Sequence, residues 1–201
     1  VFMTSTPLSE AINNTLFAYN SGQQRYLNEF IKLNKSAADM LHLGLFPNAK
    51  EITESYSAFN AVKTKLKQYE LGDPGVTVVS VGDGRTPRTA ALFAFRTKWQ
   101  CVSVDPLLSK EKIPYWESNI QRLKCYPNKV EDLDLMYNKL IIVMVHSHAN
   151  LRNTLDHIRS PVRSVVGIPC CVAYKHEIRP KEFRDAGIWS PKNLVKVWRT
   201  I

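Results

Sequence analysis

The stretch from residue 76 to residue 105 constrains the fold of this chain more than any other part of its sequence. It opens with Val-Thr-Val-Val-Ser-Val at 76–81, a run rich in β-branched residues that is bounded by Gly75 and Gly82. Such a run is typical of a strand buried on both faces of a parallel sheet. A segment rich in Ala, Leu and Phe follows at 89–97, and a second apolar run follows at 100–104. The order strand, helix, strand predicts a βαβ unit.

The connection from the first strand to the helix, Gly82-Asp83-Gly84, lets the backbone approach a ligand, because glycine has no Cβ. We expect Thr86 to cap the helix and Pro87 to be its first residue. The second strand ends in Asp105, which a βαβ unit places beside the glycine turn, where its carboxylate accepts hydrogen bonds from ribose hydroxyls. These features together predict a nucleoside-cofactor site. The alternative is the glycine turn of any α/β protein, with Asp105 as a solvated strand end.

The same turn departs from the dinucleotide fingerprint, because G-D-G-R-T-P stands where G-x-G-x-x-G is expected. The proline also removes a backbone N–H from the start of the helix, where a pyrophosphate would bind. The turn and Asp105 instead resemble motif I and the acidic second-strand tip of the class I S-adenosylmethionine-dependent methyltransferases, whose cofactor has no phosphate. The resemblance implies S-adenosylmethionine as the cofactor, with residues 82–84 beside its methionine part and Asp105 on its ribose. An NAD-dependent oxidoreductase stays a less favoured alternative.

The resemblance covers roughly residues 74–170 and implies a Rossmann-like, mostly parallel sheet with helices on both faces. Family members place an acidic or amide group against the adenine after the third strand, which we expect at 120–126. Because few residues follow the fifth strand, we expect a shortened C-terminal end and six strands, the last at 193–200. The cofactor-binding residues expected on these grounds are Gly82, Asp83, Gly84, Arg85, Thr86, Asp105, Pro106, Glu131, Asp132 and His146.

A second informative stretch runs from Lys139 to Leu151. Its apolar part at 140–145 predicts the fourth strand, and His-Ser-His-Ala-Asn follows at 146–150, where an open α/β sheet binds its ligands. A helix is expected from Leu151 to Ser160, and a fifth strand at 162–168 ends in Pro169-Cys170-Cys171. This pair of strand ends resembles a branch of class I methyltransferases that includes tRNA 2′-O-methyltransferases, in which a His-containing turn after the fourth strand is followed by a Cys-Cys pair after the fifth.

Three interpretations compete for these residues. In the first, a histidine removes a proton from the methyl acceptor, and the catalytic candidates are His148, His146 and Asn150. We favour His148, because it is nearer the helix start and the open edge. In the second, His146, His148, Cys170, Cys171 and His176 hold a metal ion, but their spacing matches no standard zinc motif, so the sequence predicts no metal site. In the third, one histidine is hydrogen-bonded in the core and the cysteines are small buried hydrophobes.

Residues 74–201 are predicted to form the methyltransferase-like domain. The first 73 residues are predicted to form helices that cap this domain and belong to the same compact unit. A helix is expected from Thr6-Pro7 through Leu8, Ile12, Leu16 and Tyr19, followed by helices at 23–34 and 37–43. The clearest begins at Asn48, with an apolar stripe at Ile52, Tyr56, Phe59, Val62, Leu66 and Tyr69 that must be buried.

Charge indicates the class of substrate. The formal net charge is +9, and residues 1–70 are nearly neutral, so the excess lies in the cofactor-binding part. A basic excess of this size is typical of nucleic-acid binding, although it is also compatible with an ordinary solvated surface. We expect RNA as the partner, bound through Lys175, Arg179, Lys181 and Arg184.

The apolar runs and the cysteines indicate the compartment in which the protein is expected. No apolar run is long enough to span a bilayer, and the four cysteines form no C-x-x-C pair, so we expect no membrane contact and reduced thiols in the cytoplasm. The chain starts at Val1, which favours a segment of a longer polypeptide with other domains.

The favoured function is methyl transfer to RNA, and the main rival is a catalytically degenerate scaffold that binds cofactor or RNA.

Overall fold

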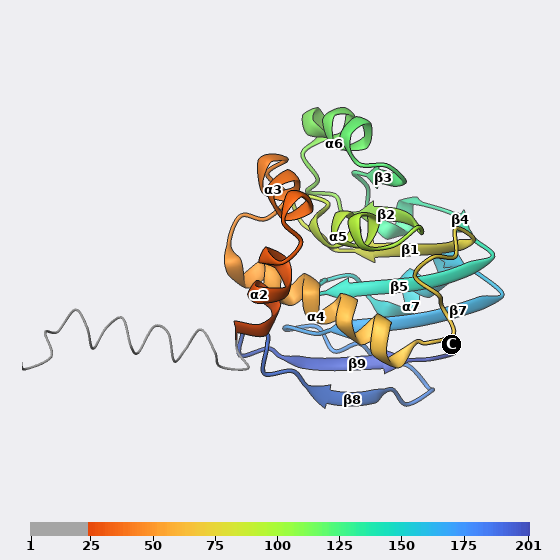
Figure 1. Cartoon of the computed structure of the whole chain (residues 1–201). Coiled ribbons are helices and arrows are strands. Elements are labelled where there is room, and N and C mark those ends of the chain that lie inside the picture. Colours follow the sequence, from red (N-terminus) through yellow and green to blue (C-terminus); the bar gives the residue numbers. More distant parts are fainter. Residues whose placement is uncertain (1–23) are drawn as a thin grey trace, which may run out of the picture.

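A seven-stranded sheet forms the centre of the molecule in the computed structural model, which describes residues 24–201 (Figure 1). Its strand order is β3-β2-β1-β5-β7-β9-β8. The first five strands in this order are parallel, whereas β9 is antiparallel to both of its neighbours. The strands are β1 (Val76–Val81), β2 (Gln100–Val104), β3 (Leu123–Tyr126), β5 (Lys139–Val145), β7 (Val162–Ile168), β8 (Lys181–Arg184) and β9 (Leu194–Trp198), with a separate pair β4 (Leu135–Met136) and β6 (Ile158–Arg159).

The strand order reverses between β1 and β5, because the chain proceeds outward through β2 and β3 and then returns to the other side of β1. In open α/β sheets this reversal leaves a crevice at the carboxyl ends of the strands, where ligands bind. The expected Rossmann-like, mostly parallel sheet is confirmed.

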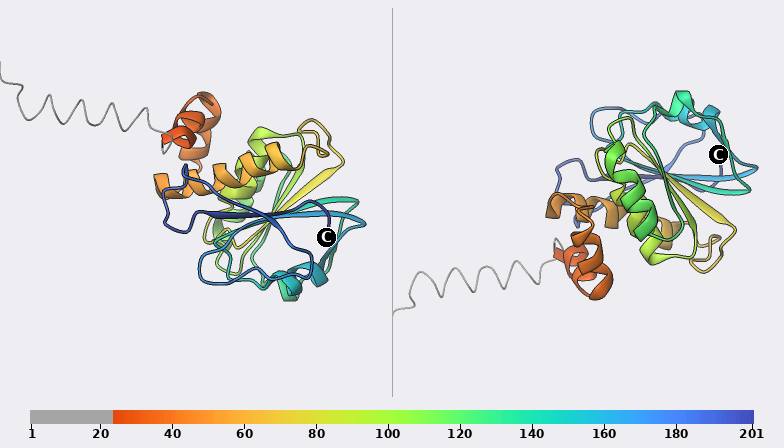
Figure 2. Two further views of the ribbon diagram at one scale, coloured as in Figure 1. Left: turned by 90° about the horizontal axis from the view of Figure 1, so that it is seen from below. Right: turned by 90° about the horizontal axis from the view of Figure 1, so that it is seen from above.

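Helices cover both faces of the sheet (Figure 2). The helices are α2 (Arg25–Ile31), α3 (Lys35–His42), α4 (Ala49–Lys65), α5 (Arg88–Arg96), α6 (Ile113–Asn119) and α7 (Leu151–His157), with short 3-10 turns η2 (Lys110–Lys112) and η3 (Val130–Asp132). Val76 and Val78 of β1 pack into the cluster that holds α4 and α5, whereas Val79 and Val81 pack into the cluster that holds α7. This alternation explains why β1 is apolar almost throughout, since both of its faces are buried.

Helix α4 follows the sequence prediction closely. The Asn48 side chain caps it by accepting a hydrogen bond from the backbone N–H of Glu51 at 3.0 Å. All six residues of the expected stripe are buried, and they share one hydrophobic cluster with the sheet. Helices α2 and α3 correspond to the helices expected at 23–34 and 37–43, whereas the helix expected from Thr6-Pro7 to Tyr19 lies outside the described residues.

The expected count of six strands was wrong, because β8 adds a seventh strand by pairing with β9. The C-terminal end is shortened in a different way, because the connection between β7 and β8, residues 169–180, contains no helix. The third strand was also predicted too long. Helix α6 ends at Asn119 with Ile120 as its C-cap, so the strand begins only at Leu123. Pro114 lies in the first turn of α6, where proline is tolerated.

Within residues 24–201, no helix combines the length and the apolar character that crossing a bilayer requires.

Candidate functional site

A cavity of about 570 Å³ opens at the carboxyl ends of β1, β2 and β5, at the point where the strand order reverses. Its volume lies within the ~300–1,000 Å³ typical of small-molecule sites. Four segments line it: the glycine turn with Arg88, the end of β2 at 104–107, the segment 128–131, and the end of β5 at 145–149. The two stretches that the sequence singles out therefore meet in one cavity.

The glycine turn is required by backbone geometry. Gly82 and Gly84 have φ angles of +87° and +77°, a region that side chains with a Cβ rarely adopt. A Cβ on Gly82 would also lie 2.6 Å from the Cβ of Ser147 and 2.8 Å from its Cα. Gly82 therefore allows the turn after β1 to pack directly against the turn after β5.

The side chain of Asp83 points away from the cavity and into the protein, where it is 2 % exposed. Its carboxylate accepts hydrogen bonds from the hydroxyls of Ser80 and Ser103, both at 2.9 Å. It also accepts the backbone N–H groups of Thr89 and Ala90, both at 3.2 Å, at the start of α5. Asp83 thus accepts hydrogen bonds from the start of α5, and its side chain does not line the cavity, contrary to the expectation from the sequence.

The expected capping of α5 by Thr86 was also wrong, because Asp83 accepts the N–H groups at the start of this helix. Helix α5 begins at Arg88, and Pro87 occupies the N-cap position rather than the first helical position. The Thr86 hydroxyl donates instead to the carbonyl of Leu45 at 2.6 Å. Thr86 therefore joins the turn to the segment that precedes α4 and does not line the cavity.

Asp105 lies where the sequence places it, at the tip of β2 beside the glycine turn. One carboxylate oxygen accepts the N–H of Gly84 at 2.7 Å, and the other accepts the N–H of Leu107 at 2.7 Å. Each carboxylate oxygen can accept more than one hydrogen bond, so these two contacts orient the group without exhausting it. Asp105 is therefore a fixed acceptor on the wall of the cavity.

His146 is held on both sides of its ring. Its Nδ1 lies 3.3 Å from a carboxylate oxygen of Glu54, and its Nε2 lies 3.2 Å from the carbonyl oxygen of Lys192. Glu54 is 2 % exposed on α4 and pairs with Lys50 at 2.8 Å. Because both ring nitrogens have partners in the protein, the contacts favour an orienting role for His146 over a reactive one.

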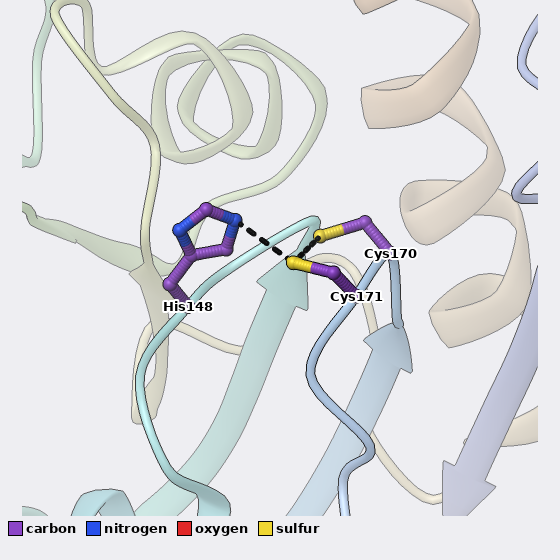
Figure 3. Close-up of side chains that lie close together, drawn as sticks. All are labelled: His148, Cys170 and Cys171. Carbon is purple, nitrogen blue, oxygen red and sulfur yellow. Dashed lines mark hydrogen bonds between the residues drawn. The ribbon is translucent and has the colours of Figure 1, made fainter.

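His148 borders the cavity from the same turn and faces two cysteines of the neighbouring strand end (Figure 3). Its Nε2 lies 3.3 Å from the sulfur of Cys171, which lies 3.4 Å from the sulfur of Cys170. The hydrogen bond with Cys170 raises the pKa of the Cys171 thiol. Beneath this turn, burial raises the pKa of Tyr174, whose hydroxyl donates to the carbonyl of Ser147 at 2.9 Å.

Other residues predicted for the site are dispersed. Asn150 caps α7, accepting the N–H groups of Arg152 at 2.8 Å and Asn153 at 3.3 Å, and it does not line the cavity. Glu131 and Pro106 do line it, whereas Asp132 borders a separate hollow. Arg85 is exposed and lies outside the lining.

All four basic residues predicted to bind substrate are exposed, and two of them border different hollows. Lys175 and Arg179 are exposed, and Lys181 and Arg184 lie at opposite ends of β8. Lys181 borders a hollow with Lys65, Lys67 and Arg199, whereas Arg184 borders the hollow next to Cys170 and Cys171.

Sequence reasoning missed Glu54. Its neighbours Thr53, Ser55 and Ser57 are small polar residues that are also buried, so this helix is covered on most sides. A carboxylate among small polar residues within an apolar helix was the available signal. The cavity residues Arg88, Leu107, Asn128, Lys129 and Ser147 were also not predicted.

Arg88 is the cavity residue with a positive charge near the glycine turn. Its guanidinium pairs with Glu51 of α4 at 3.1 Å and donates to the carbonyl of Asp83. Both contacts hold it against the protein, and Glu51 offsets its charge.

Comparison with known proteins found no matching family model and no matching curated protein. Solved structures of similar shape include a mutant of MtNAS in complex with S-adenosylmethionine, with a TM-score of 0.49 and 12 % identity over 87 % of this chain and 74 % of that one. Magnesium protoporphyrin IX methyltransferase from Synechocystis PCC 6803, with bound S-adenosylmethionine, has a TM-score of 0.47 and 11 % identity over 82 % of each chain. A Burkholderia thailandensis 1,6-didemethyltoxoflavin-N1-methyltransferase has a TM-score of 0.42 and 13 % identity over 100 % of this chain and 76 % of that one.

Proposed function

We propose that this Rossmann-like protein binds S-adenosylmethionine in the cavity between β1, β2 and β5 and transfers its methyl group to an acceptor, with RNA as the acceptor class. The start of α5 distinguishes between cofactors with and without phosphate. In dinucleotide-binding proteins a pyrophosphate occupies the free N–H groups at this helix start. A cofactor without phosphate does not need them.

The observation that carries the proposal is the buried carboxylate of Asp83. It already accepts the N–H groups of Thr89 and Ala90, so these donors are not available to a phosphate. Its negative charge also lies directly behind the glycine turn and would repel a second anion. The site therefore favours a nucleoside cofactor that carries positive rather than negative charge, which describes S-adenosylmethionine and not NAD.

The lining residues fit such a cofactor. Asp105 is oriented by two backbone N–H groups and presents a carboxylate to the cavity, as recognition of ribose hydroxyls requires. Glu131 adds a second carboxylate from the segment 128–131. Gly82 and Gly84 line the cavity between Val81 and Arg88 and bring no side chain into it.

When bound, the sulfonium of the cofactor would supply an electrophilic methyl group. The acceptor atom would bond to the methyl carbon in line with the breaking carbon–sulfur bond, and S-adenosylhomocysteine would leave with the electrons of that bond. The protein's part is mainly positioning, which holds the reacting atoms in one geometry and excludes water. Of the two histidines in the turn after β5, we propose His148 for the chemistry, because its ring is exposed and borders the cavity. His146 is a positioning residue, because Glu54 and Lys192 engage both ring nitrogens.

RNA is proposed from charge. The excess of basic residues beyond residue 70 and the exposure of Lys175 and Arg179 support a polyanionic substrate. Binding through phosphates weakens linearly in a plot of log affinity against log salt concentration, with a slope that reports the number of phosphates contacted.

Single-turnover transfer from cofactor with a labelled methyl group to pooled cellular RNA tests the proposal. We expect labelled RNA with the wild-type chain and at least a tenfold loss of rate in His148→Ala, with cofactor affinity unchanged. The matched control is His42→Ala, an exposed histidine on α3. Tight cofactor binding with no transfer to any RNA, protein or small-molecule pool would favour a scaffold over an enzyme.

A further inference from the structure

The structure assigns a binding site for a thiophilic metal ion to His148, Cys170 and Cys171. One ligand atom of each residue lies within 4.8 Å of the other two. This is the single group of three or more His, Cys, Asp or Glu residues with that geometry among residues 24–201. The assignment rests on the positions of these atoms and does not depend on the proposed function.

The observed distances are close to those that a zinc ion imposes. A tetrahedral ion with Zn–S of about 2.3 Å and Zn–N of about 2.0–2.1 Å holds two sulfurs about 3.8 Å apart and a sulfur and a nitrogen about 3.6 Å apart. Here the two sulfurs are 3.4 Å apart, and Cys171 Sγ is 3.3 Å from His148 Nε2. An ion could therefore be bound with side-chain movements of a few tenths of an ångström at these two pairs and a closer approach of Cys170 to the imidazole.

The fold creates this cluster from strand ends that are neighbours in space. His148 follows β5 and the cysteines follow β7, and these two strands are paired in parallel along their whole length. Parallel neighbours end at the same edge of the sheet, so the two turns face each other (Figure 3). The spacing along the chain therefore matches no zinc motif even though the three ligands converge.

The chemistry of the ligands selects the ion. Two thiolates and one imidazole are soft and borderline donors, which suit zinc or Cu(I) and do not suit Mg²⁺ or Ca²⁺. Two thiolates also neutralise the charge of a dication. The side chains are accessible, because His148 and Cys171 are exposed and Cys170 is half-buried, so an ion can enter from solvent.

Three protein ligands leave a fourth position for water or for a substrate atom, as in catalytic rather than structural zinc sites. The main cavity includes His148, and a second hollow includes Cys170 and Cys171 together with Arg184 and Lys192. An ion held by all three would thus lie between the proposed cofactor cavity and an open, basic hollow. If the proposed function is correct, His148 acts in the chemistry as a metal ligand, and the open position receives the acceptor group.

Metal titration of the whole chain tests the site. The protein is reduced, freed of metal with a chelator and titrated with Co²⁺, whose thiolate charge-transfer and visible bands report sulfur ligands. We expect saturation at one ion per chain, displacement of Co²⁺ by Zn²⁺, and at least a tenfold loss of affinity in His148→Ala, Cys170→Ser and Cys171→Ser. His148→Cys keeps three soft ligands and should retain binding.

Controls separate this site from other thiols and histidines. Cys101 and Cys125 are buried, so two thiols should react rapidly with a thiol reagent in the native protein, and one equivalent of Zn²⁺ should protect both. His42→Ala should bind metal as the wild type does. A failure to bind one ion per chain, or metal binding by Cys170→Ser and Cys171→Ser that is as tight as that of the wild type, would overturn the assignment. Unchanged S-adenosylhomocysteine binding in these variants would show that a loss of metal is not a loss of fold or of the cofactor cavity.

Discussion

Asp83 offers the sharpest test of how the turn after β1 is built. Replacing Asp83 by alanine removes four accepted hydrogen bonds at once, from Ser80, Ser103, Thr89 and Ala90, at a side chain that is 2 % exposed. The two hydroxyls can rotate toward other acceptors, but the two backbone N–H groups at the start of α5 cannot.

The size of the effect follows from these contacts. Loss of a helix cap costs about 0.5–2 kcal/mol, and each buried donor left without a partner costs about 1–3 kcal/mol. These two estimates overlap, because the same N–H groups are counted in both. We therefore expect Asp83→Ala to lower the free energy of unfolding by about 3–5 kcal/mol, a large fraction of the roughly 5–15 kcal/mol of an ordinary domain.

Urea unfolding followed by circular dichroism measures this change. Asp83→Asn should cost less than Asp83→Ala, because the amide keeps one acceptor oxygen of nearly the same shape. Asp156→Ala, at an exposed carboxylate on α7, is the control and should stay within about 0.5 kcal/mol of the wild type. A loss below about 1 kcal/mol for Asp83→Ala would refute the capping role and, with it, the argument that the helix start is closed to phosphate.

Three further predictions concern Gly82, Tyr26 and the salt dependence of RNA binding. Gly82→Ala should destabilise the protein by more than about 2 kcal/mol and weaken cofactor binding, because a Cβ would overlap Ser147 at a positive φ, whereas Gly72→Ala, with open space around it, should stay within about 0.5 kcal/mol. Burial, with the neighbouring Asp185 carboxylate, raises the pKa of Tyr26 from 10.0 to about 12. The stability from its protonated form should be fully present below pH 10 and be lost as pH rises from 10 to 12, and Tyr26→Phe should flatten that alkaline decline in urea unfolding. RNA affinity should fall linearly in a log–log plot against salt, and affinity that does not change between 50 and 200 mM salt would contradict an interaction through phosphates.

The sequence was sufficient for the elements whose pattern is local. The strands β1, β2, β5 and β7 are continuous apolar runs bounded by turn residues, and the predicted ranges agree with the observed ones to within a residue at each end. Their order along the chain was enough to anticipate that Asp105 and residues 146–148 meet at one cavity. Strand β8 was missed because it is short and its sequence, Lys-Glu-Phe-Arg, is mostly exposed. Its place in the sheet depends on pairing with β9 and not on its own pattern.

The contacts within the site could not be predicted from the sequence, because they join residues from separate elements. Asp83 lies between two glycines with positive φ angles and turns its side chain into the protein, where Ser80 and the start of α5 donate to it. The local sequence did not show this direction. Glu54 reaches His146 from a helix about ninety positions earlier, a contact that no local pattern encodes. The cluster of His148 with Cys170 and Cys171 likewise depends on the pairing of β5 with β7.

The central claim is that the cavity accepts a nucleoside cofactor without phosphate. Isothermal titration of the wild-type chain with S-adenosylhomocysteine and with NAD tests it most directly, with Asp105→Ala measured alongside. We predict saturable binding of S-adenosylhomocysteine at one site, at least tenfold weaker binding in folded Asp105→Ala because charge-assisted hydrogen bonds contribute about 1.5–3 kcal/mol each, and no detectable binding of NAD. Binding of NAD in preference to S-adenosylhomocysteine, or S-adenosylhomocysteine binding that is unchanged in Asp105→Ala, would contradict the account.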